Sequence, residues 1–425
     1  MMKNDPSPLN PAFPALKKVP KTGVIYVMTE AKKHGYKAGS DWVNFGQGQP
    51  ETGSLSEAPE RISTFSTDAQ TDEYSPVEGI EPLRQAVAEY YNRTYRKGQK
   101  SQYSAENVAI SPGGRSGLTR IVATLGSLNL GHFLPDYTAY EELLGLFKGF
   151  SPIPILLEPE RHYDFSIQEL RREISGRGLG AILLSNPCNP TGKLIYDEEL
   201  EAWVQVCRNL NCMLILDEFY SSYIWPENIT NTETNSISAA SSVNDVNKDP
   251  ILIVDGLTKN WRYPGWRISW TIGPKEVIEA VSSAGSFLDG GASHPIQKAT
   301  VDLLEDGLSR EENIAIQKTF SKKRHILLQG LKELGIDIKI EPQGTFYVWG
   351  NLKHLPEPLN TGMSFFEKAL EHKVITVPGE FFDVNPGKRR YGRPSRFRHH
   401  CRFSFGPKLS DIKAGLERFR DLLEM

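Results

Sequence analysis

The segment that decides the fold is Asp255-Gly256-Leu257-Thr258-Lys259-Asn260-Trp261-Arg262-Tyr263-Pro264-Gly265-Trp266-Arg267. The apolar run before it, Ile251 to Val254, predicts a buried strand that delivers Lys259 onto a turn. A lysine in that place can form a Schiff base with an aldehyde, provided that burial and neighbouring cations lower its pKa. Arg267 can hold a phosphate dianion through two charged hydrogen bonds, which a lysine cannot reproduce. Because Lys259 is one of 49 basic residues, the prediction depends on the segments that accompany it.

Length and composition limit the number of domains and the kinds of partner that the chain can have. The chain has 425 residues, of which 39% are hydrophobic, so it can bury a large core in up to about three domains or in a closely joined pair. A net charge of −3 gives no electrostatic footprint for nucleic acid or for an anionic membrane. The sequence shows neither a secretory signal nor an apolar run near the length of a membrane span. Four cysteines without metal-ligand spacing predict reduced thiols in a cytoplasmic protein (Cys188, Cys207, Cys212 and Cys401).

A first phosphate-binding device is predicted near residue 113. Val108 to Ser111 predicts a strand, Pro112 to Ser116 a turn, and the apolar spacing that follows predicts a helix. Glycines at the start of a helix let backbone N–H groups approach an anion, and the helix dipole favours negative charge there. We therefore assign Gly113, Gly114 and Arg115 to a phosphate.

Strands and helices alternate along the next hundred residues. The runs 153–157, 181–185 and 213–216 predict strands and 166–175 predicts a charged helix, a rhythm typical of a parallel sheet with right-handed crossovers. Asp217 lies at the buried end of its strand, where an acid is unfavourable unless a cation is near. The turn 186–192, Asn-Pro-Cys-Asn-Pro-Thr-Gly, also follows a strand, at the edge where such sheets bind ligands.

Four segments together resemble a known family. The segments are Gly256-x-Thr258-Lys259 with 264–267, the turn 186–192, the run 134–140 and Tyr74-Ser75-Pro76-Val77-Glu78-Gly79-Ile80. The family that they resemble is that of the fold-type I pyridoxal-phosphate (PLP) enzymes, specifically the class I/II aminotransferases similar to aspartate aminotransferase. The resemblance covers about Gly46 to Phe405. It implies an α/β fold with a mostly parallel central sheet, helices on both faces, and a smaller α+β domain. The implied division is an N-terminal arm and small-domain segment (1–50), a large PLP-binding domain (51–310) and a small C-terminal domain (311–425).

The resemblance also implies roles for individual residues. Lys259 would form the Schiff base and move protons, while Asp217 would keep the pyridine nitrogen protonated and Tyr220 would donate to the ring hydroxyl oxygen. The implied cofactor-binding residues are Gly113, Gly114, Arg115, Tyr137, Asn189, Asp217, Tyr220, Thr258, Lys259, Arg267 and, from a neighbouring subunit, Tyr74. The implied substrate-binding residues are Gly48, Asn189 and Arg402, with Arg402 on the α-carboxylate.

The expected function is PLP-dependent transfer of an amino group between an amino acid and a 2-oxo acid, in a homodimer with shared active sites. A lyase of the same fold is the alternative, because fold and cofactor residues do not determine which bond breaks; a PLP-sensing regulator is disfavoured because no DNA-binding domain fits before Gly23. Gly256 departs from the serine that the family often has there, which removes a phosphate donor. The run 287–291 carries no arginine of the kind used for acidic substrates, and Asp289 is a hypothetical contact for a cationic or polar substrate side chain.

Other segments give simpler expectations. Residues 1–20 are predicted to be an arm rather than a folded element, and residues 227–249 a polar surface loop. The C-terminal part predicts strands at 336–340, 346–349 and 374–377 after a long helix that begins near Glu311. The basic run 388–402 is predicted to be a solvated loop, except for Arg402 in a strand.

Overall fold

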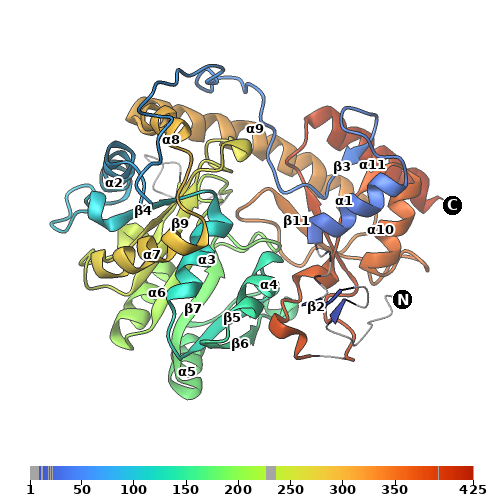
Figure 1. Ribbon diagram of the computed structural model, residues 1–425. Helices are drawn as coiled ribbons and strands as arrows, with labels where there is room; N and C mark the ends of the chain where they lie inside the picture. Colours follow the sequence, from blue (N-terminus) through green and yellow to red (C-terminus); the bar gives the residue numbers. More distant parts are fainter. Residues whose placement is uncertain are drawn as a thin grey trace.

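The structure is a computed structural model that describes residues 9–10, 13–17, 19, 21, 23–225, 236–390 and 392–424. The chain forms two lobes, with a seven-stranded sheet in the larger one (Figure 1). The strand order is β4 (Val108–Ser111), β10 (Ser269–Ile272), β9 (Ile251–Gly256), β8 (Met213–Asp217), β7 (Leu179–Ser185), β5 (Asn129–Leu134) and β6 (Ser151–Leu156). Only β10 runs antiparallel to its neighbours, so the mostly parallel sheet predicted from the alternating pattern is confirmed.

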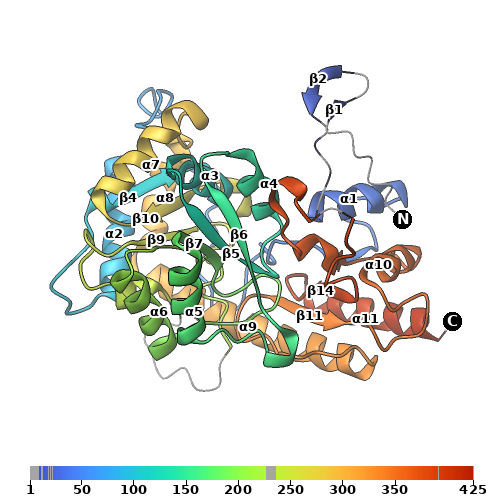
Figure 2. The same cartoon turned by 90° about the horizontal axis from the view of Figure 1, so that it is seen from below.

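Helices cover both faces of this sheet because their apolar stripes must be buried. Helices α3 (Gly114–Thr124) and α7 (Lys275–Leu288) lie on one face, and α5 (Ile167–Arg177) and α6 (Asp197–Asn209) lie on the other (Figure 2). Helix α5 begins at a capping box, in which the Ser166 hydroxyl accepts from the Glu169 N–H, and it ends at Gly178 in the left-handed conformation. The remaining helices of this lobe are α2 (Glu81–Tyr95), α4 (Ala139–Leu146) and α8 (His294–Thr300).

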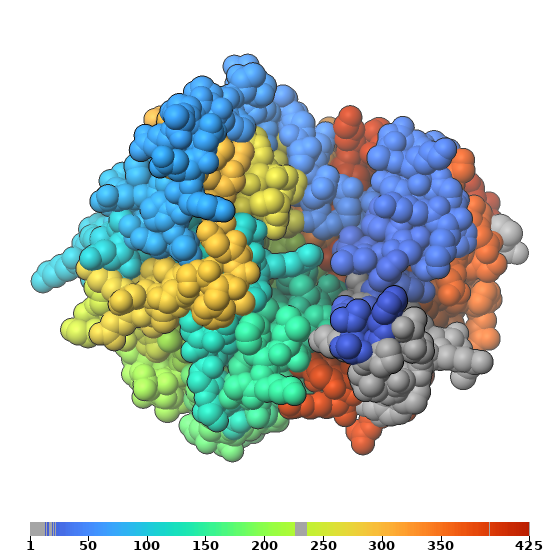
Figure 3. Space-filling model, viewed as in Figure 1, coloured from blue at the N-terminus to red at the C-terminus, as the bar shows by residue number. Residues whose placement is uncertain are grey.

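The smaller lobe combines short strands with longer helices. Its three-stranded sheet has the order β11 (Tyr347–Asn351), β14 (His400–Ser404) and β13 (Val377–Pro378), and β3 (Val43–Asn44) pairs in parallel with β12 (Val374–Ile375). Its helices are α1 (Gly23–Lys33), α10 (Gly362–Glu371) and α11 (Leu409–Leu423), and the long α9 (Asp306–Glu333) leads into it from the larger lobe. The chain between α1 and α2 passes over both lobes, in blue in Figure 3. Short 3₁₀ turns are η1 (Ala105–Asn107), η2 (Pro159–Arg161), η3 (Ala239–Ser242), η4 (Pro264–Trp266), η5 (Val301–Leu304), η6 (Gly379–Phe382) and η7 (Pro386–Lys388).

Two strand predictions in this lobe were wrong. The alternating run 336–340 makes a single bridge, Asp337 to Asn351, because the chain reaches the edge of β11 at one point only. The run 374–377 is split into β12 and β13, which belong to different sheets. Alternation therefore did not predict which strands these residues pair with.

The described part of the N-terminal arm is folded, contrary to the prediction. Strand β1 (Leu9–Asn10) pairs antiparallel with β2 (Phe13–Lys17), and this ribbon projects from the smaller lobe (Figure 2). A proline within β2 is compatible with pairing, because a two-stranded ribbon leaves alternate N–H groups free.

Residues 236–240 are buried, so the predicted surface loop was wrong there, whereas residues 244 and 247–248 are exposed as predicted; residues 226–235 lie outside the described residues. Ser236, Ser238 and Asp249 are buried. Charged partners satisfy the polar groups of this segment: Arg96 donates to Ala240 O and Val243 O at 2.6 and 2.7 Å, and Arg208 binds Asp249. Within the described residues, no helix is both long enough and apolar enough to cross a membrane.

Candidate active site

Five segments from the larger lobe meet at one edge of the sheet. Strands β4, β5, β7, β8 and β9 run in the same direction, so their carboxyl ends lie together, at the edge where α/β sheets bind ligands. The turns that follow these strands supply most of the predicted site residues. They are Gly113 to Arg115 after β4, Tyr137 after β5, Asn189 after β7, Asp217 to Tyr220 at the end of β8, and Thr258 and Lys259 after β9.

Lys259 reaches across the site to the substrate-side loop. Its Nζ donates to the carbonyl of Gly48, which follows β3 of the smaller lobe. Burial lowers the pKa of Lys259 to about 7, and the guanidinium groups of Arg402, Arg115 and Arg267 contribute to this lowering, against the opposite influence of Asp217. The amine is therefore largely available as a nucleophile near neutral pH.

Asp217 is a buried carboxyl directed at the same site. Burial raises its pKa to about 6, while a hydrogen bond from the Tyr140 hydroxyl, 2.9 Å from Oδ2, and the nearby Lys259 oppose that rise. Tyr140 belongs to a motif of the sequence, but the motif alone gives it no role. It lies on the first turn of α4, and only the fold shows that it reaches Asp217.

Asn189 and Arg402 join the two lobes across the site. Arg402 lies on β14 and is buried; its Nη1 donates to Asn189 Oδ1 at 2.8 Å and its Nη2 donates to Gly46 O at 3.0 Å. Arg402 Nε is buried without a hydrogen-bond partner among the described residues. A buried guanidinium with a spare donor is suited to bind a carboxylate.

Two tyrosine hydroxyl groups lie next to this arginine. The hydroxyl oxygens of Tyr220 and Tyr347 are 2.9 Å apart, and the Arg402 guanidinium carbon lies 3.9 Å from the centre of the Tyr347 ring. Burial raises the pKa of both tyrosines, so both hydroxyls keep their protons and can donate. The sequence indicates Tyr347 only as part of the predicted strand 346–349, because its contact with Tyr220 spans the two lobes.

The glycine turn after β4 forms a close cradle. Gly113 has φ +93°, and a Cβ there would overlap the guanidinium of Arg267, while a Cβ at Gly114 would overlap the ring of Phe219. Arg115 Nε donates to the Tyr137 hydroxyl at 3.2 Å. Among the described residues, neither Arg115 nor Arg267 forms a salt bridge, so two positive charges lie near Lys259 without a protein anion of their own.

Gly256 has a steric reason for departing from the serine expected there. A Cβ at this position would lie 2.6 Å from Ile268 O and 2.5 Å from Ser269 Cα on the adjacent antiparallel strand β10. A serine therefore does not fit without moving β10. Thr258 is partly exposed on the lysine turn.

Two residues lie away from this cluster. Tyr74 is 99% exposed, so within one chain it contributes nothing to the site. Asp289 binds the fully buried Arg120, with contacts of 2.5 and 3.0 Å, so the structure gives it a protein partner, and its contact with a substrate side chain stays a hypothesis. No group of His, Cys, Asp and Glu side chains in the described part of the chain could hold a metal ion.

Comparison with known proteins agrees with the fold. The family described as aminotransferase class I and II matches residues 40–418. The chain is 26% identical to the aspartate aminotransferase of Sulfurisphaera tokodaii over 90% of each chain, and 25% identical to the probable aspartate/prephenate aminotransferase of Aquifex aeolicus over 91% of this chain and 92% of that protein. The solved structure of Thermus thermophilus aspartate aminotransferase with maleate matches with a TM-score of 0.76 at 24% identity, covering 96% of this chain and 98% of that chain. The chain therefore belongs to the aminotransferase class I and II family and is an amino-group transferase.

Proposed function

We propose that this chain is a homodimeric pyridoxal 5'-phosphate-dependent aminotransferase, which moves an amino group between an amino acid and a 2-oxo acid. The observation that carries the proposal is Lys259, an amine with a pKa near 7 that faces three arginines and one carboxyl at the carboxyl edge of the sheet. A bound aldehyde needs such an amine, and a bound phosphate needs such a concentration of positive charge.

The residues present fit this cofactor. The two arginines without protein anions and the glycine cradle suit its phosphate, which Thr258 and Tyr74 of the partner subunit would also contact. Tyr137 would cover one face of the ring. Asn189 and Tyr220 would donate to the ring hydroxyl oxygen, and Asp217 would pair with the ring nitrogen. Burial holds the Asp217 pKa at about 6, above its usual range, and a pyridinium beside the carboxyl would lower it.

Lys259 would hold the cofactor covalently through its amine and, once the substrate amine displaces it, would carry a proton to and from the substrate Cα. Bound PLP withdraws electrons from that carbon and so makes its proton acidic. A lysine with a pKa near 7 can both accept and return a proton at neutral pH, which is what a general acid and base requires. The carbonyl of Gly48 orients Nζ toward the substrate side.

Arg402 would bind the substrate α-carboxylate, beside Asn189 and the loop that contains Gly48. Both the amino acid and the 2-oxo acid carry this carboxylate, so one arginine serves both half-reactions. The named relatives include aspartate and aspartate/prephenate aminotransferases, so aspartate and aromatic amino acids are the first donors to test. The absence of an arginine in 287–291 argues against a strict dicarboxylate preference.

The proposal includes a homodimer, the division into 1–50, 51–310 and 311–425, and a cytoplasmic location. The exposed Tyr74 supports the dimer, because a tyrosine that the resemblance assigns to a phosphate can reach one only in another subunit. Arg402 and Lys259, on different lobes but in one site, support the division. Four buried free thiols support a reducing compartment.

Stopped-flow absorbance of the purified protein against a panel of amino acids, and then 2-oxo acids, tests the proposal. The cofactor band should convert to a stable pyridoxamine form with a donor and return with a 2-oxo acid. Lys259→Ala should lose this exchange, while Lys318→Ala, which changes a mostly exposed lysine, should keep it. Substrate consumption with the band restored without a 2-oxo acid would indicate a lyase, and no band after addition of PLP would refute the cofactor.

A further inference from the structure

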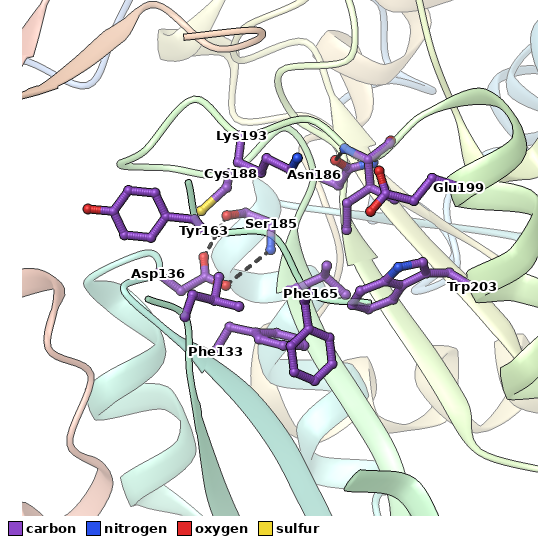
Figure 4. A pocket seen from close by; sticks show the side chains of 13 residues that line it. Phe133, Asp136, Tyr163, Phe165, Ser185, Asn186, Cys188, Lys193, Glu199 and Trp203 are labelled. Atoms are coloured by element: carbon purple, nitrogen blue, oxygen red, sulfur yellow. Dashed lines mark hydrogen bonds between the residues drawn. The ribbon is translucent and has the colours of Figure 1, made fainter. Parts of the chain in front are cut away.

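A buried carboxyl, that of Asp136, lies just after the end of β5, next to the proposed ring-stacking residue Tyr137. Asp136 is 1% exposed and lines a cavity with Phe133, Phe165, Trp203, Ser185 and Cys188 (Figure 4). Lys193, which also lines this cavity, forms an ion pair with Asp164. Asp136 therefore depends on hydrogen bonds for its polar partners, and in apolar surroundings those bonds are strong.

The hydrogen bonds of Asp136 connect two neighbouring strand ends. Ser185, the last residue of β7, donates from Oγ to Asp136 Oδ1 at 2.5 Å, and Figure 4 shows this pair on the wall of the cavity. The backbone N–H of Tyr137 donates to the same oxygen at 2.7 Å. The carboxyl group of Asp136 thus holds the backbone of Tyr137, the proposed ring-stacking residue, and the end of the strand that leads to Asn189.

The connection continues from Ser185 to the substrate arginine. The backbone N–H of Asn189 donates to Ser185 Oγ at 3.0 Å, and Asn189 Oδ1 accepts from Arg402 at 2.8 Å. Because Ser185 gives its only hydroxyl hydrogen to Asp136, its lone pairs remain directed toward the Asn189 N–H. Asp136 also donates its own N–H to Phe382 O of the smaller lobe at 3.3 Å, and Phe382 lies beside Arg402.

We propose that Asp136 and Ser185 are positioning residues, which fix the backbone of Asn189 and, through its side chain, the guanidinium of Arg402. This inference rests on the proposed function, since it assigns Asn189 to the cofactor and Arg402 to the substrate. Neither Asp136 nor Ser185 needs to touch substrate or cofactor. Their contribution is to keep Asn189 and Arg402, which belong to different lobes, at a fixed distance from each other.

The test compares Ser185→Ala, Ser185→Cys and Asp136→Asn with the parent protein loaded with PLP. Loss of the Ser185 hydroxyl leaves the Asn189 N–H without its partner, so we expect KM for the best amino donor to rise about tenfold. We also expect the pH midpoint of the cofactor absorbance to rise, because a misplaced Asn189 no longer withdraws charge from the ring oxygen beside the Lys259 nitrogen. Asp136→Asn keeps an acceptor at Oδ1 for the Ser185 hydroxyl and the Tyr137 N–H, but it places an amide donor at Oδ2, which accepts from the Ser185 N–H at 3.4 Å, so it should raise KM in the same direction as Ser185→Ala.

A double-mutant cycle separates positioning from general damage. If Ser185 acts through Asn189, Ser185→Ala should change KM by less than about twofold, and should leave the pH midpoint unchanged, in an Asn189→Ala background. Trp203→Phe, which alters the same cavity outside this chain of hydrogen bonds, is the matched control and should leave both values unchanged. Equal effects of Ser185→Ala in both backgrounds, or a pH midpoint unchanged in Ser185→Cys and Ser185→Ala, would overturn the inference. A parent protein without a cofactor band would instead overturn the proposed function.

Discussion

Gly113→Ala is a sharp perturbation of the cradle after β4. The residue has φ +93° and ψ 156°, a combination that side chains other than hydrogen disfavour by about 1–3 kcal/mol. The added methyl group would also occupy the place of the Arg267 guanidinium. Since an arginine side chain is flexible, the protein can fold by moving that guanidinium aside. The substitution should therefore weaken phosphate binding as well as lower the free energy of unfolding.

The expected magnitude follows from the hydrogen bond that a displaced Arg267 would no longer donate to the phosphate. One charge-assisted hydrogen bond contributes about 1.5–3 kcal/mol, which corresponds to PLP binding about 10- to 150-fold weaker. Titration of the cofactor-free protein with PLP, followed by absorbance, measures the dissociation constant directly. Urea denaturation of the same cofactor-free protein should show the separate decrease of about 1–3 kcal/mol in the free energy of unfolding.

Gly265→Ala is the matched control. It lies in the lysine segment, and a Cβ there would meet no atom within 4 Å. Its PLP affinity should therefore equal that of the parent protein. If Gly113→Ala bound PLP as tightly as Gly265→Ala, the reasoning that links Gly113, Arg267 and the phosphate would be wrong.

Four further predictions concern other parts of the molecule. Arg402→Lys should raise KM for the amino acid and for the 2-oxo acid together, about 10-fold or more, in initial-rate assays of both half-reactions; an effect on one substrate only would contradict the shared carboxylate site. Because the pKa of Lys259 is lowered from 10.5 to about 7, its amine is protonated below that pH, so PLP capture by the cofactor-free protein should rise through pH 7 and level off; a rise that continues to pH 10.5 would contradict this. Mixing inactive Tyr74→Ala and Lys259→Ala chains should restore about a quarter of the parent activity, since half of the random dimers carry one intact site; no recovery under exchange conditions would exclude a shared site. Asp289→Ala should lower the free energy of unfolding by about 3–5 kcal/mol in urea, because it leaves the buried Arg120 unpaired, while substrate preferences stay the same; a change in preference with normal stability would reverse that conclusion.

The order of strands and helices in the larger lobe could be predicted from the sequence because local signals agree there. The apolar run before Lys259, for example, forms β9, and the glycines near residue 113 lie at the start of α3. Each of these elements buries its apolar residues in the same sheet, so local pattern and final structure coincide.

Contacts between distant segments could not be predicted in the same way. Tyr140 reaches Asp217 from another strand end, and Tyr347 reaches Tyr220 from the other lobe. The buried part of the segment 236–249 was misjudged because composition counts polar groups without showing that Arg96 and Arg208 satisfy them. For the same reason Asp289 looked free in the sequence, although its partner Arg120 lies 169 residues away.

The three arginines that lower the pKa of Lys259 also repel one another across the site. This repulsion between positive charges lowers the stability of the cofactor-free protein. A dianionic ligand bound among the arginines offsets the repulsion and so raises the free energy of unfolding. Any ligand that binds only the folded chain adds stability in proportion to the logarithm of its concentration relative to its dissociation constant. The lifetime of this protein in a cell should consequently follow the supply of its cofactor, with chains made during vitamin shortage being the first to be degraded.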